Sequence, residues 1–192
     1  MLIVLGGFLG NGRKMFAHRL AKRKNFHLYD TDAKKMRRFE LQRGGAIKEM
    51  VQRPYREEQR LFLYKNVLAD FSKISKMHPD MIIEDSFHRT AAREYFLTEA
   101  RKYFKPVVFI WIDSDEAHVA ERIRHMVTTG AIGSYEEGVR RRKSAAKHFT
   151  QDHTMRVFKC VKGDEAELDA LWSLICGMTN GDMNAKLDAL LQ

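Results

Sequence analysis

The sequence predicts an α/β fold in which a five-stranded parallel sheet is covered by helices on both faces. Short apolar runs rich in valine and isoleucine alternate with longer helical patterns along the 192-residue chain. Such runs are typical of parallel strands, which are buried on both faces. The length suits one domain with a sizeable core. The chain is 44% hydrophobic and 31% charged, which indicates a globular rather than a disordered protein.

Five apolar runs are predicted as strands. The first, Leu2–Leu5, is too short for a signal segment and lacks a preceding basic region, so we expect a buried strand. Pro79 and Pro106 fall just ahead of the third and fourth runs, where proline is tolerated. In chain order the predicted strands are Leu2–Leu5, Phe26–Tyr29, Met81–Glu84, Val107–Ile112 and Arg156–Val161.

Helical patterns separate these strands. Pro54 interrupts the pattern between the second and third helices, because proline disrupts a helix interior. No segment approaches the length of a transmembrane helix, so we expect no membrane association. The predicted helices cover residues 13–24, 33–50, 55–77, 90–103, 115–127, about 135–148, 164–177 and 182–191.

The segment between the first strand and the first helix is nearly a phosphate-binding loop. Such a loop has a glycine, four residues, a second glycine, a lysine and then a serine or threonine. Gly7 and Gly12 have this separation, whereas Arg13 stands at the lysine position and Lys14 at the hydroxyl position. A strand, a glycine loop and a helix start present backbone amides and the positive helix end to an anion. An ordinary glycine-rich turn, with Arg13 and Lys14 exposed, is the alternative.

Acidic residues follow three further strands at the points where they end. Because ligands of parallel sheets bind beyond the carboxyl ends of the strands, these acids predict a metal and polar-substrate site beside the glycine loop. Each of them could instead cap a helix, and we assign Asp113 and Asp115 to structural roles. The acids kept for the site are Asp30, Asp32 and Asp85.

Together these motifs resemble the small P-loop kinases, the group that includes shikimate, gluconate and adenylate kinases. Gly10-Asn11-Gly12 resembles their glycine loop, and Asp30-Thr31-Asp32 resembles the Asp-Thr-Asp motif of shikimate kinases. Gly44-Gly45-Ala46-Ile47, followed by Tyr55-Arg56, is similar to the Gly-x-x-Ile and Phe-Arg motifs of that family. Glu121-Arg122-Ile123 resembles the opening of the adenylate kinase lid. The run Arg140-Arg141-Arg142 lies in a stretch similar to the lid's return helix, unless it is simply a solvated helix face.

The sequence also departs from this group. Arg13 and Lys14 replace the lysine and the hydroxyl residue, so the phosphate-binding motif is degenerate. The stretch from Asp32 to Gly44 is longer than in shikimate kinases, and no triple glycine follows the third strand. Residues 85–89, Asp-Ser-Phe-His-Arg, look more like kinases that act on varied small molecules or nucleotides.

The resemblance implies an ATP-dependent phosphotransferase that acts on a small molecule or nucleotide. The resemblance covers about residues 1–176. We expect one domain over residues 1–181, with a lid at about 124–148, and a short C-terminal helix at 182–192. Magnesium is expected at Asp30 and Asp85, and the acceptor at Asp32, Arg56 and Arg89. Asp32, Arg13 and Lys14 are the expected catalytic residues, although Asp32 could instead be a helix cap. ATP is expected to bind Gly7, Gly10, Asn11, Gly12, Arg13, Lys14, Arg122 and Arg141.

Two other functions stay open. The changes at Arg13 and Lys14 are compatible with a kinase-like protein that binds a nucleotide or a partner without turnover. The net charge of +9 is compatible with a nucleic-acid-binding module, but the basic stretch 19–24 lacks interleaved aromatic residues. Cys160 and Cys176 have no metal-ligand spacing, so we expect a reducing, cytoplasmic location. The sequence leaves the acceptor and the oligomeric state open.

Overall fold

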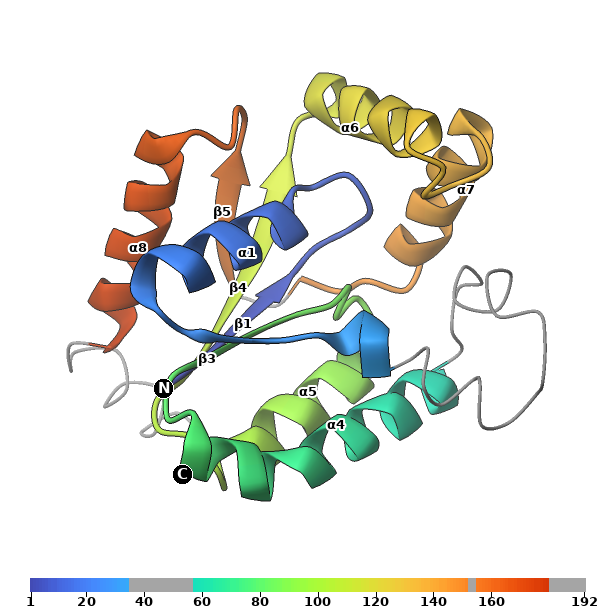
Figure 1. The fold of residues 1–192 in the computed structure, drawn as a ribbon. Coiled ribbons are helices and arrows are strands. Elements are labelled where there is room, and N and C mark those ends of the chain that lie inside the picture. Colours follow the sequence, from blue (N-terminus) through green and yellow to red (C-terminus); the bar gives the residue numbers. More distant parts are fainter. Residues whose placement is uncertain (35–56, 152–154, 180–192) are drawn as a thin grey trace.

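The computed structural model confirms the predicted fold class (Figure 1). It describes residues 1–34, 57–151 and 155–179. Five parallel strands form one sheet in the order β2-β3-β1-β4-β5. Every predicted strand is present, with bounds within two residues of the prediction: β1 Leu2–Gly6, β2 His27–Tyr29, β3 Met81–Glu84, β4 Val107–Ser114 and β5 Arg156–Cys160.

Helices cover both faces of the sheet (Figure 1). The helices α1 and α8 pack on one face and α4 and α5 on the other, whereas α6 and α7 pair beyond the carboxyl ends of the strands. Most of the predicted helix 33–50 and all of 182–191 lie outside the described residues. No helix in the described ranges is long and apolar enough to cross a membrane. The bounds are α1 Arg13–Lys24, α4 Glu57–Met77, α5 Thr90–Ala100, α6 Glu116–Thr128, α7 Tyr135–Ala146 and α8 Glu165–Thr179.

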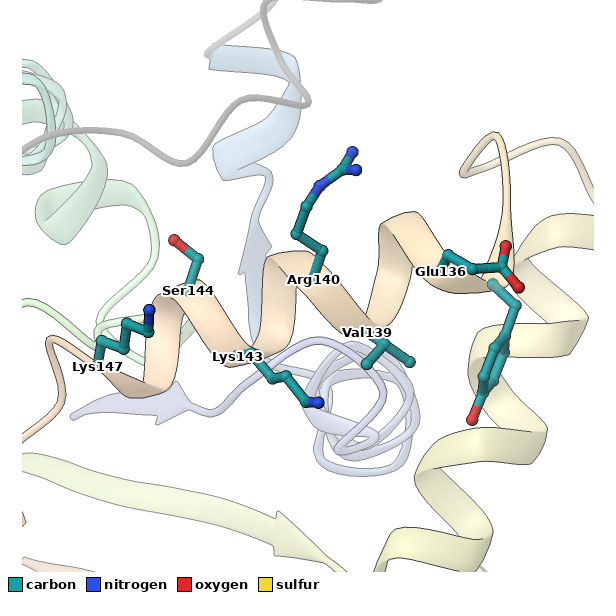
Figure 2. Close-up of a pocket in the computed structure, with 7 residues that line it drawn as sticks. Glu136, Val139, Arg140, Lys143, Ser144 and Lys147 are labelled. Carbon is teal, nitrogen blue, oxygen red and sulfur yellow. The ribbon is translucent and has the colours of Figure 1, made fainter.

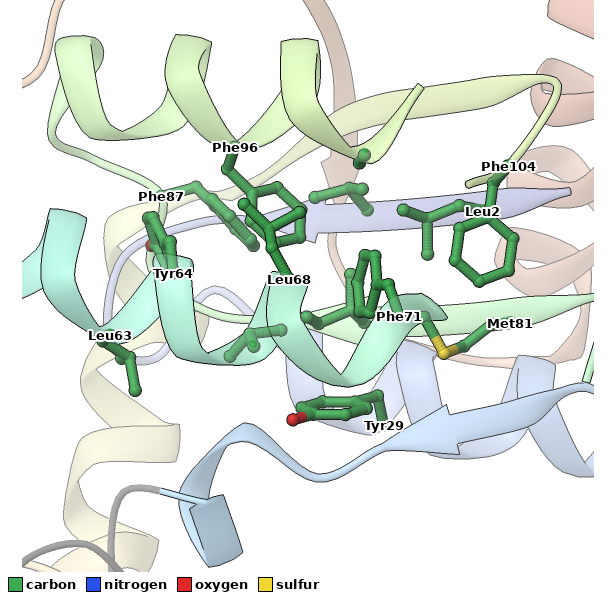
Figure 3. Packing of buried hydrophobic residues seen from close by; sticks show 14 of the residues in the cluster. Leu2, Tyr29, Leu63, Tyr64, Leu68, Phe71, Met81, Phe87, Phe96 and Phe104 are labelled. Atoms are coloured by element: carbon green, nitrogen blue, oxygen red, sulfur yellow. The ribbon is translucent and has the colours of Figure 1, made fainter. Parts of the chain in front are cut away.

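The strand β1 is buried on both faces because its side chains alternate between two hydrophobic clusters. Leu2 belongs to the cluster beneath α4 and α5, and the next residue, Ile3, belongs to the cluster beneath α1 and α8. Figure 3 shows the first cluster, in which the ring of Phe71 makes edge-to-face contacts with Phe96 and Phe104. Burying an apolar side chain of this size stabilises a fold by about 1.5–3 kcal/mol. These contacts therefore hold α4 and α5 firmly on the sheet.

The loop after β1 lies at a topological switch point of the sheet. β1 pairs with β3 on one side and with β4 on the other, so successive parts of the chain diverge from it. Ligands of open parallel sheets bind at such points, beyond the carboxyl ends of the strands. The glycine-rich segment therefore occupies the place where this type of sheet binds ligands.

A glycine allows α7 to pack closely against α6. A Cβ atom at Gly138 would lie 2.6 Å from Cγ2 of Ile123 and 2.9 Å from Cδ1 of Ile132. Both helices begin at a capping side chain that accepts a backbone amide hydrogen bond, Asp115 for α6 and Ser134 for α7. The structural role predicted for Asp115 is thereby confirmed. Capping and close packing together fix where the arginines of α6 and α7 lie.

Candidate functional site

The glycine loop, residues 7–12, is tied to the end of β4. Gly10 and Gly12 have φ angles of +85° and +86°, which glycine adopts without the strain that other residues incur. Asn11 is fully buried, and its amide nitrogen donates to the backbone oxygen of Ile112 (2.8 Å) and to Oδ1 of Asp113 (3.3 Å). The loop conformation is therefore fixed by side-chain contacts from inside the fold.

Phe8 fixes the outer part of the glycine loop. Its ring makes edge-to-face contacts with Trp111 of β4 and with Phe149, at centroid distances of 4.9 and 5.2 Å. The rings of Trp111 and Phe149 are themselves stacked at 4.0 Å. Since Phe149 follows α7 in the chain, this aromatic cluster also connects the glycine loop to the α6–α7 pair.

The helix α1 begins directly at the loop without a capping side chain. Gly12 is its N-cap residue and provides no side-chain acceptor for the first-turn amides. The first amides of a helix have no intrahelical partner, and the helix dipole places positive potential at this end. An anion beyond Gly12 would accept these hydrogen bonds, which is how phosphate binds at helix starts.

Arg13 lies on the glycine loop and pairs with the end of β3. Its Nη1 donates to the backbone oxygens of Gly7 (2.9 Å) and Phe8 (3.1 Å), and its Nε donates to Oε2 of Glu84 (3.0 Å). Glu84 is buried and Arg13 is largely so. The alternative in which Arg13 is a free, exposed residue does not hold. Glu84 is a residue of this site that the sequence analysis did not select.

Lys14 and Asp32 form an exposed ion pair beside the loop. Nζ of Lys14 lies 3.2 Å from Oδ2 of Asp32. Partial burial lowers the pKa of the Lys14 ammonium, but the carboxylates of Asp32, Glu84 and Asp30 outweigh this and hold the pKa above its ordinary value. Lys14 is therefore protonated at neutral pH and adds a full positive charge at the start of α1.

Two arginines from the α6–α7 pair also contact the glycine loop. Arg122 donates from Nη1 to the backbone oxygen of Gly10 (3.1 Å) and to Oγ of Ser114 (2.9 Å). Arg142 donates from Nη1 to the backbone oxygen of Leu9 (3.2 Å) and to the side-chain oxygen of Asn11. Within the described residues neither guanidinium forms an ion pair with a carboxylate. Among the described residues, both charges therefore lie at the loop without a directly paired carboxylate.

The arginine that contacts the loop differs from the one chosen from sequence. Arg141 forms an ion pair with Glu137 one turn earlier on its own helix, α7. Arg142 follows the buried Gly138 by one helical turn and lies on the packed side of α7. That spacing is the signal in the sequence that points to Arg142. Arg141 stays a prediction as a phosphate ligand.

The acids predicted to bind magnesium have other partners. Oδ1 of Asp30 accepts the backbone amide of Ala33 (2.8 Å), so Asp30 holds the capping role that was considered for Asp32. Asp85 is buried, and both of its carboxylate oxygens lie 2.9 Å from Nη1 of Arg60 on α4. Arg60 was not selected from sequence, because its meeting with Asp85 depends on how α4 packs.

A neutral histidine lies beside the Asp85–Arg60 pair. His88 is buried, and its Nδ1 lies 3.0 Å from Oγ of Ser86. Burial lowers the pKa of His88 to about 3, and the charges of Arg60 and Arg89 add to the effect. Arg89, predicted to bind the acceptor, lies in the segment between β3 and α5, with its Nε 4.0 Å from Oε2 of Glu57 at the start of α4. Arg56 lies outside the described residues.

A basic groove runs along α7 (Figure 2). Its volume is about 540 Å³. Arg140 and Ser144 extend to one side of the helix in this view and Lys143 to the other. The basic side chains that line this groove belong to the same helical segment that contributes Arg142 to the loop. Its lining residues are Tyr135, Glu136, Val139, Arg140, Lys143, Ser144 and Lys147.

The residues present do not fit a magnesium ion in the manner of phosphate-binding loops. Such loops hold magnesium through the serine or threonine hydroxyl that follows the lysine, together with an aspartate. Here that position carries Lys14, and Asp30 and Asp85 accept hydrogen bonds from Ala33 and Arg60. Among the described residues no three histidine, cysteine or acidic side chains are grouped as metal ligands.

Solved structures share this fold, although no family model and no curated protein matches the sequence. A sugar kinase from a Janibacter species has a TM-score of 0.60 at 14% identity over 90% of this chain and 92% of its own. A gluconokinase from Sinorhizobium meliloti has a TM-score of 0.60 at 14% identity, covering 93% and 97%. Kti12 from Chaetomium thermophilum, in complex with ADP-AlF3, has a TM-score of 0.55 at 12% identity, covering 94% and 100%.

These likenesses establish the fold. They extend over at least nine-tenths of this chain, and the three proteins are small P-loop kinases or resemble them in fold. The resemblance inferred from the sequence motifs is therefore confirmed at the level of the fold. At identities of 12–14% activity and substrate do not follow from the comparison.

Proposed function

We propose that this chain, which has the fold of the small P-loop kinases, binds a nucleoside triphosphate such as ATP at its glycine loop. We further propose that it transfers the terminal phosphoryl group to a small molecule or nucleotide. In this proposal the acceptor binds to Asp32, which follows β2, and to Arg89, which follows β3. Arg56 is a further candidate ligand. A soluble kinase working in the cytoplasm would fit these assignments.

The observation that carries the proposal is the uncompensated charge at the loop. Arg122 and Arg142 contact backbone oxygens of the glycine loop and, within the described residues, have no carboxylate partner. Guanidinium groups bind phosphate oxygens with charge-assisted hydrogen bonds. Together with the first-turn amides of α1, they provide donors on several sides of one anion. Two arginines without a carboxylate partner, beside the first-turn amides of α1, are suited to binding a polyphosphate.

The chain's own residues can then perform the two tasks of phosphoryl transfer, positioning and charge stabilisation. Arg122 and Arg142 would hold the transferred group and stabilise the charge that develops on it. The ion pair with Lys14 brings the Asp32 carboxylate beside the start of α1. The Asp32 side chain is also partly exposed, so an acceptor hydroxyl can reach it. A carboxylate in this position orients that hydroxyl and takes its proton.

The direct test compares two neighbouring arginines of α7. We expect Arg142→Gln to weaken ATP binding about 10- to 100-fold, because a hydrogen bond to a charged group contributes about 1.5–3 kcal/mol. Arg141→Gln, the change at the ligand expected from sequence, should weaken binding less, because the Arg141 guanidinium is already paired with Glu137. Isothermal titration calorimetry with ATP measures both. If both variants lose the same ATP affinity, phosphate binding would have to be assigned to the whole Arg140–Arg142 run rather than to Arg142.

Turnover is tested separately. ADP release is measured with a panel of sugars, shikimate-like acids and nucleoside monophosphates as acceptors. Arg124→Gln serves as a control, since Arg124 lies on α6 but stacks on Tyr135 rather than on the loop. Release of ADP with one acceptor class, lost in Arg122→Gln and kept in Arg124→Gln, supports the kinase assignment.

A second function is favoured by one contact. The Arg13 guanidinium is held by Glu84 and by two loop oxygens, in the space next to where phosphate would bind. If this arrangement persists when the nucleotide binds, the protein would bind nucleotide without turnover. ATP binding with no ADP release for any acceptor would favour this second function.

A further inference from the structure

We propose that the ammonium group of Lys14 takes the place of the magnesium ion, so that the glycine loop binds ATP without a divalent cation. This inference rests on the proposed nucleotide site and adds to it the chemical form of the ligand, free rather than magnesium-bound ATP.

The first argument is the position of Lys14. It is the second residue of α1 and stands where phosphate-binding loops carry the hydroxyl ligand of magnesium. A lysine ammonium has three donors and no acceptor, so it cannot coordinate a cation. Its charge would also repel an ion placed at the end of its side chain. The same donors can bind phosphate oxygens, which are the groups that magnesium would otherwise hold.

The second argument is that Lys14 is held by the acids of the site. Its Nζ lies 3.2 Å from Oδ2 of Asp32, at the end of the Asp30-Thr31-Asp32 segment. Glu84 and Asp30 also stabilise its charged form. Asp32 therefore contacts the ammonium directly, and Glu84 and Asp30 act on its charge from further away. The pair with Asp32 holds the ammonium beside the start of α1.

The third argument is that the remaining acids are committed elsewhere. Glu84 pairs with Arg13, and Asp85 receives both hydrogen bonds of Arg60 Nη1. Asp30 caps the segment that follows β2. In the part of the chain that the structure describes, no cluster of three potential metal ligands is left. A metal site would require several of these contacts to break.

The fourth argument is charge balance. A magnesium ion neutralises two negative charges of a triphosphate. Here Lys14 and Arg13 on α1, with Arg122 and Arg142 from the α6–α7 pair, bring four positive charges to one loop. Lys14 and Arg13 are paired with Asp32 and Glu84, whereas Arg122 and Arg142 have no carboxylate partner among the described residues, which leaves two positive charges, as many as a magnesium ion carries. The protein itself can therefore neutralise the ligand.

The experiment measures ATP affinity of the full chain by isothermal titration calorimetry, in excess magnesium chloride and in excess EDTA. We expect the wild-type dissociation constant in EDTA to be equal to or lower than that in magnesium, because magnesium competes with Lys14 for the same phosphate oxygens. Binding in magnesium only would overturn this inference and leave the nucleotide site intact. Binding in neither condition would overturn the nucleotide site and this inference with it.

Variants assign the effect to Lys14. Lys14→Ser should weaken binding in EDTA about 10- to 100-fold, through loss of a charge-assisted hydrogen bond, and should regain affinity in magnesium. Lys22→Ser, in the exposed last turn of the same helix, is the matched control and should behave as wild type. The Lys14 side chain is 60% exposed, so the variant is expected to fold, and a thermal unfolding curve checks this. If the ATP affinity of the Lys14→Ser protein is the same with and without magnesium, the assignment to Lys14 is overturned.

Discussion

At the scale of single residues, the two positions that depart from the phosphate-binding pattern each have a carboxylate neighbour. Arg13 is longer and planar compared with the lysine it replaces, and such a change is not conservative at a tight phosphate site. The structure accommodates it because Glu84 binds Nε and the loop oxygens bind Nη1. Lys14 likewise meets Asp32. Both departures from the phosphate-binding pattern therefore have a carboxylate partner at the carboxyl end of a neighbouring strand.

Asp32 provides a residue-scale prediction. Asp32→Asn should reduce phosphoryl transfer about 10²- to 10⁴-fold, because an amide keeps the shape of the carboxylate but cannot accept the acceptor's proton. The exposed pair with Lys14 is expected to contribute only about 0–1 kcal/mol to folding, so stability should change little. ADP release with an active acceptor and a parallel ATP titration separate turnover from binding.

The control for this prediction is Asp169→Asn, which changes an exposed acid on α8 that pairs with Arg23. It should leave turnover unchanged. If Asp32→Asn loses ATP affinity but keeps its turnover at saturation, Asp32 serves only to hold Lys14 in place, and the role of proton acceptor passes to another group.

Residues whose position follows from the end of a strand could be placed from the sequence, whereas contacts that depend on packing could not. The glycine positions and the Asp30–Asp32 segment follow directly from strand ends, so the sequence indicates them. Glu84 is an acid at a strand end too, but its partner Arg13 is 71 residues away and the pair requires the folded sheet. The contact between Arg60 and Asp85 likewise needs α4 to pack on its cluster.

At the scale of secondary-structure elements, the prediction succeeded because the patterns are strong. Strands buried on both faces give continuous apolar runs, and all five were located. The starts of α6 and α7 are marked by Asp115 and Ser134, which cap them. What the sequence did not give is which side of α7 meets the loop. That side is set by close packing at Gly138. Arg141 and Arg142 are adjacent in sequence but point in different directions from the helix, so the sequence alone did not distinguish them.

The α6–α7 packing leads to an element-scale prediction. Gly138→Ala should be less stable than Gly177→Ala by about 1–3 kcal/mol, the usual cost of overpacking. The same substitution gives the same gain in helix propensity at both sites, about 1 kcal/mol, so the difference isolates packing. At Gly138 a Cβ atom would meet Ile123 and Ile132, whereas at Gly177 it would meet no described atom within 4 Å beyond the adjacent residues and the nearby backbone of its own helix. Urea unfolding measures both.

The same pair of variants tests the site. Because α7 must move to admit the new methyl group, Arg142 would shift away from Leu9, and ATP affinity should fall in Gly138→Ala but not in Gly177→Ala. Equal stability of the two variants would mean that α6 and α7 are packed less closely than the structure has them.

At the scale of the whole molecule, one site joins parts of the chain that are distant in sequence. The start of α1 provides amides, Arg13 and Lys14, whereas α6 and α7 provide Arg122 and Arg142. The α6–α7 pair lies beyond the strand ends and touches the rest of the fold near the loop (Figure 1). A polyphosphate at the loop would bridge these parts, so its binding should stabilise the fold as a whole.

This bridging leads to a prediction on thermal stability. A ligand that binds only the folded state adds about 2.7 kcal/mol at 100 times its dissociation constant. For a chain of this length about 1 kcal/mol corresponds to a Tm shift of about 2–4 °C, so saturating ATP should raise Tm by about 5–11 °C.

Adenosine, which lacks phosphates, should give no comparable shift, because the donors at the loop are charged or amide groups suited to phosphate. The shift should persist in EDTA and shrink in Arg142→Gln. A rise in Tm with adenosine as large as that with ATP would place the ligand's binding energy on the base rather than on the phosphates, and the glycine loop would then not be the site.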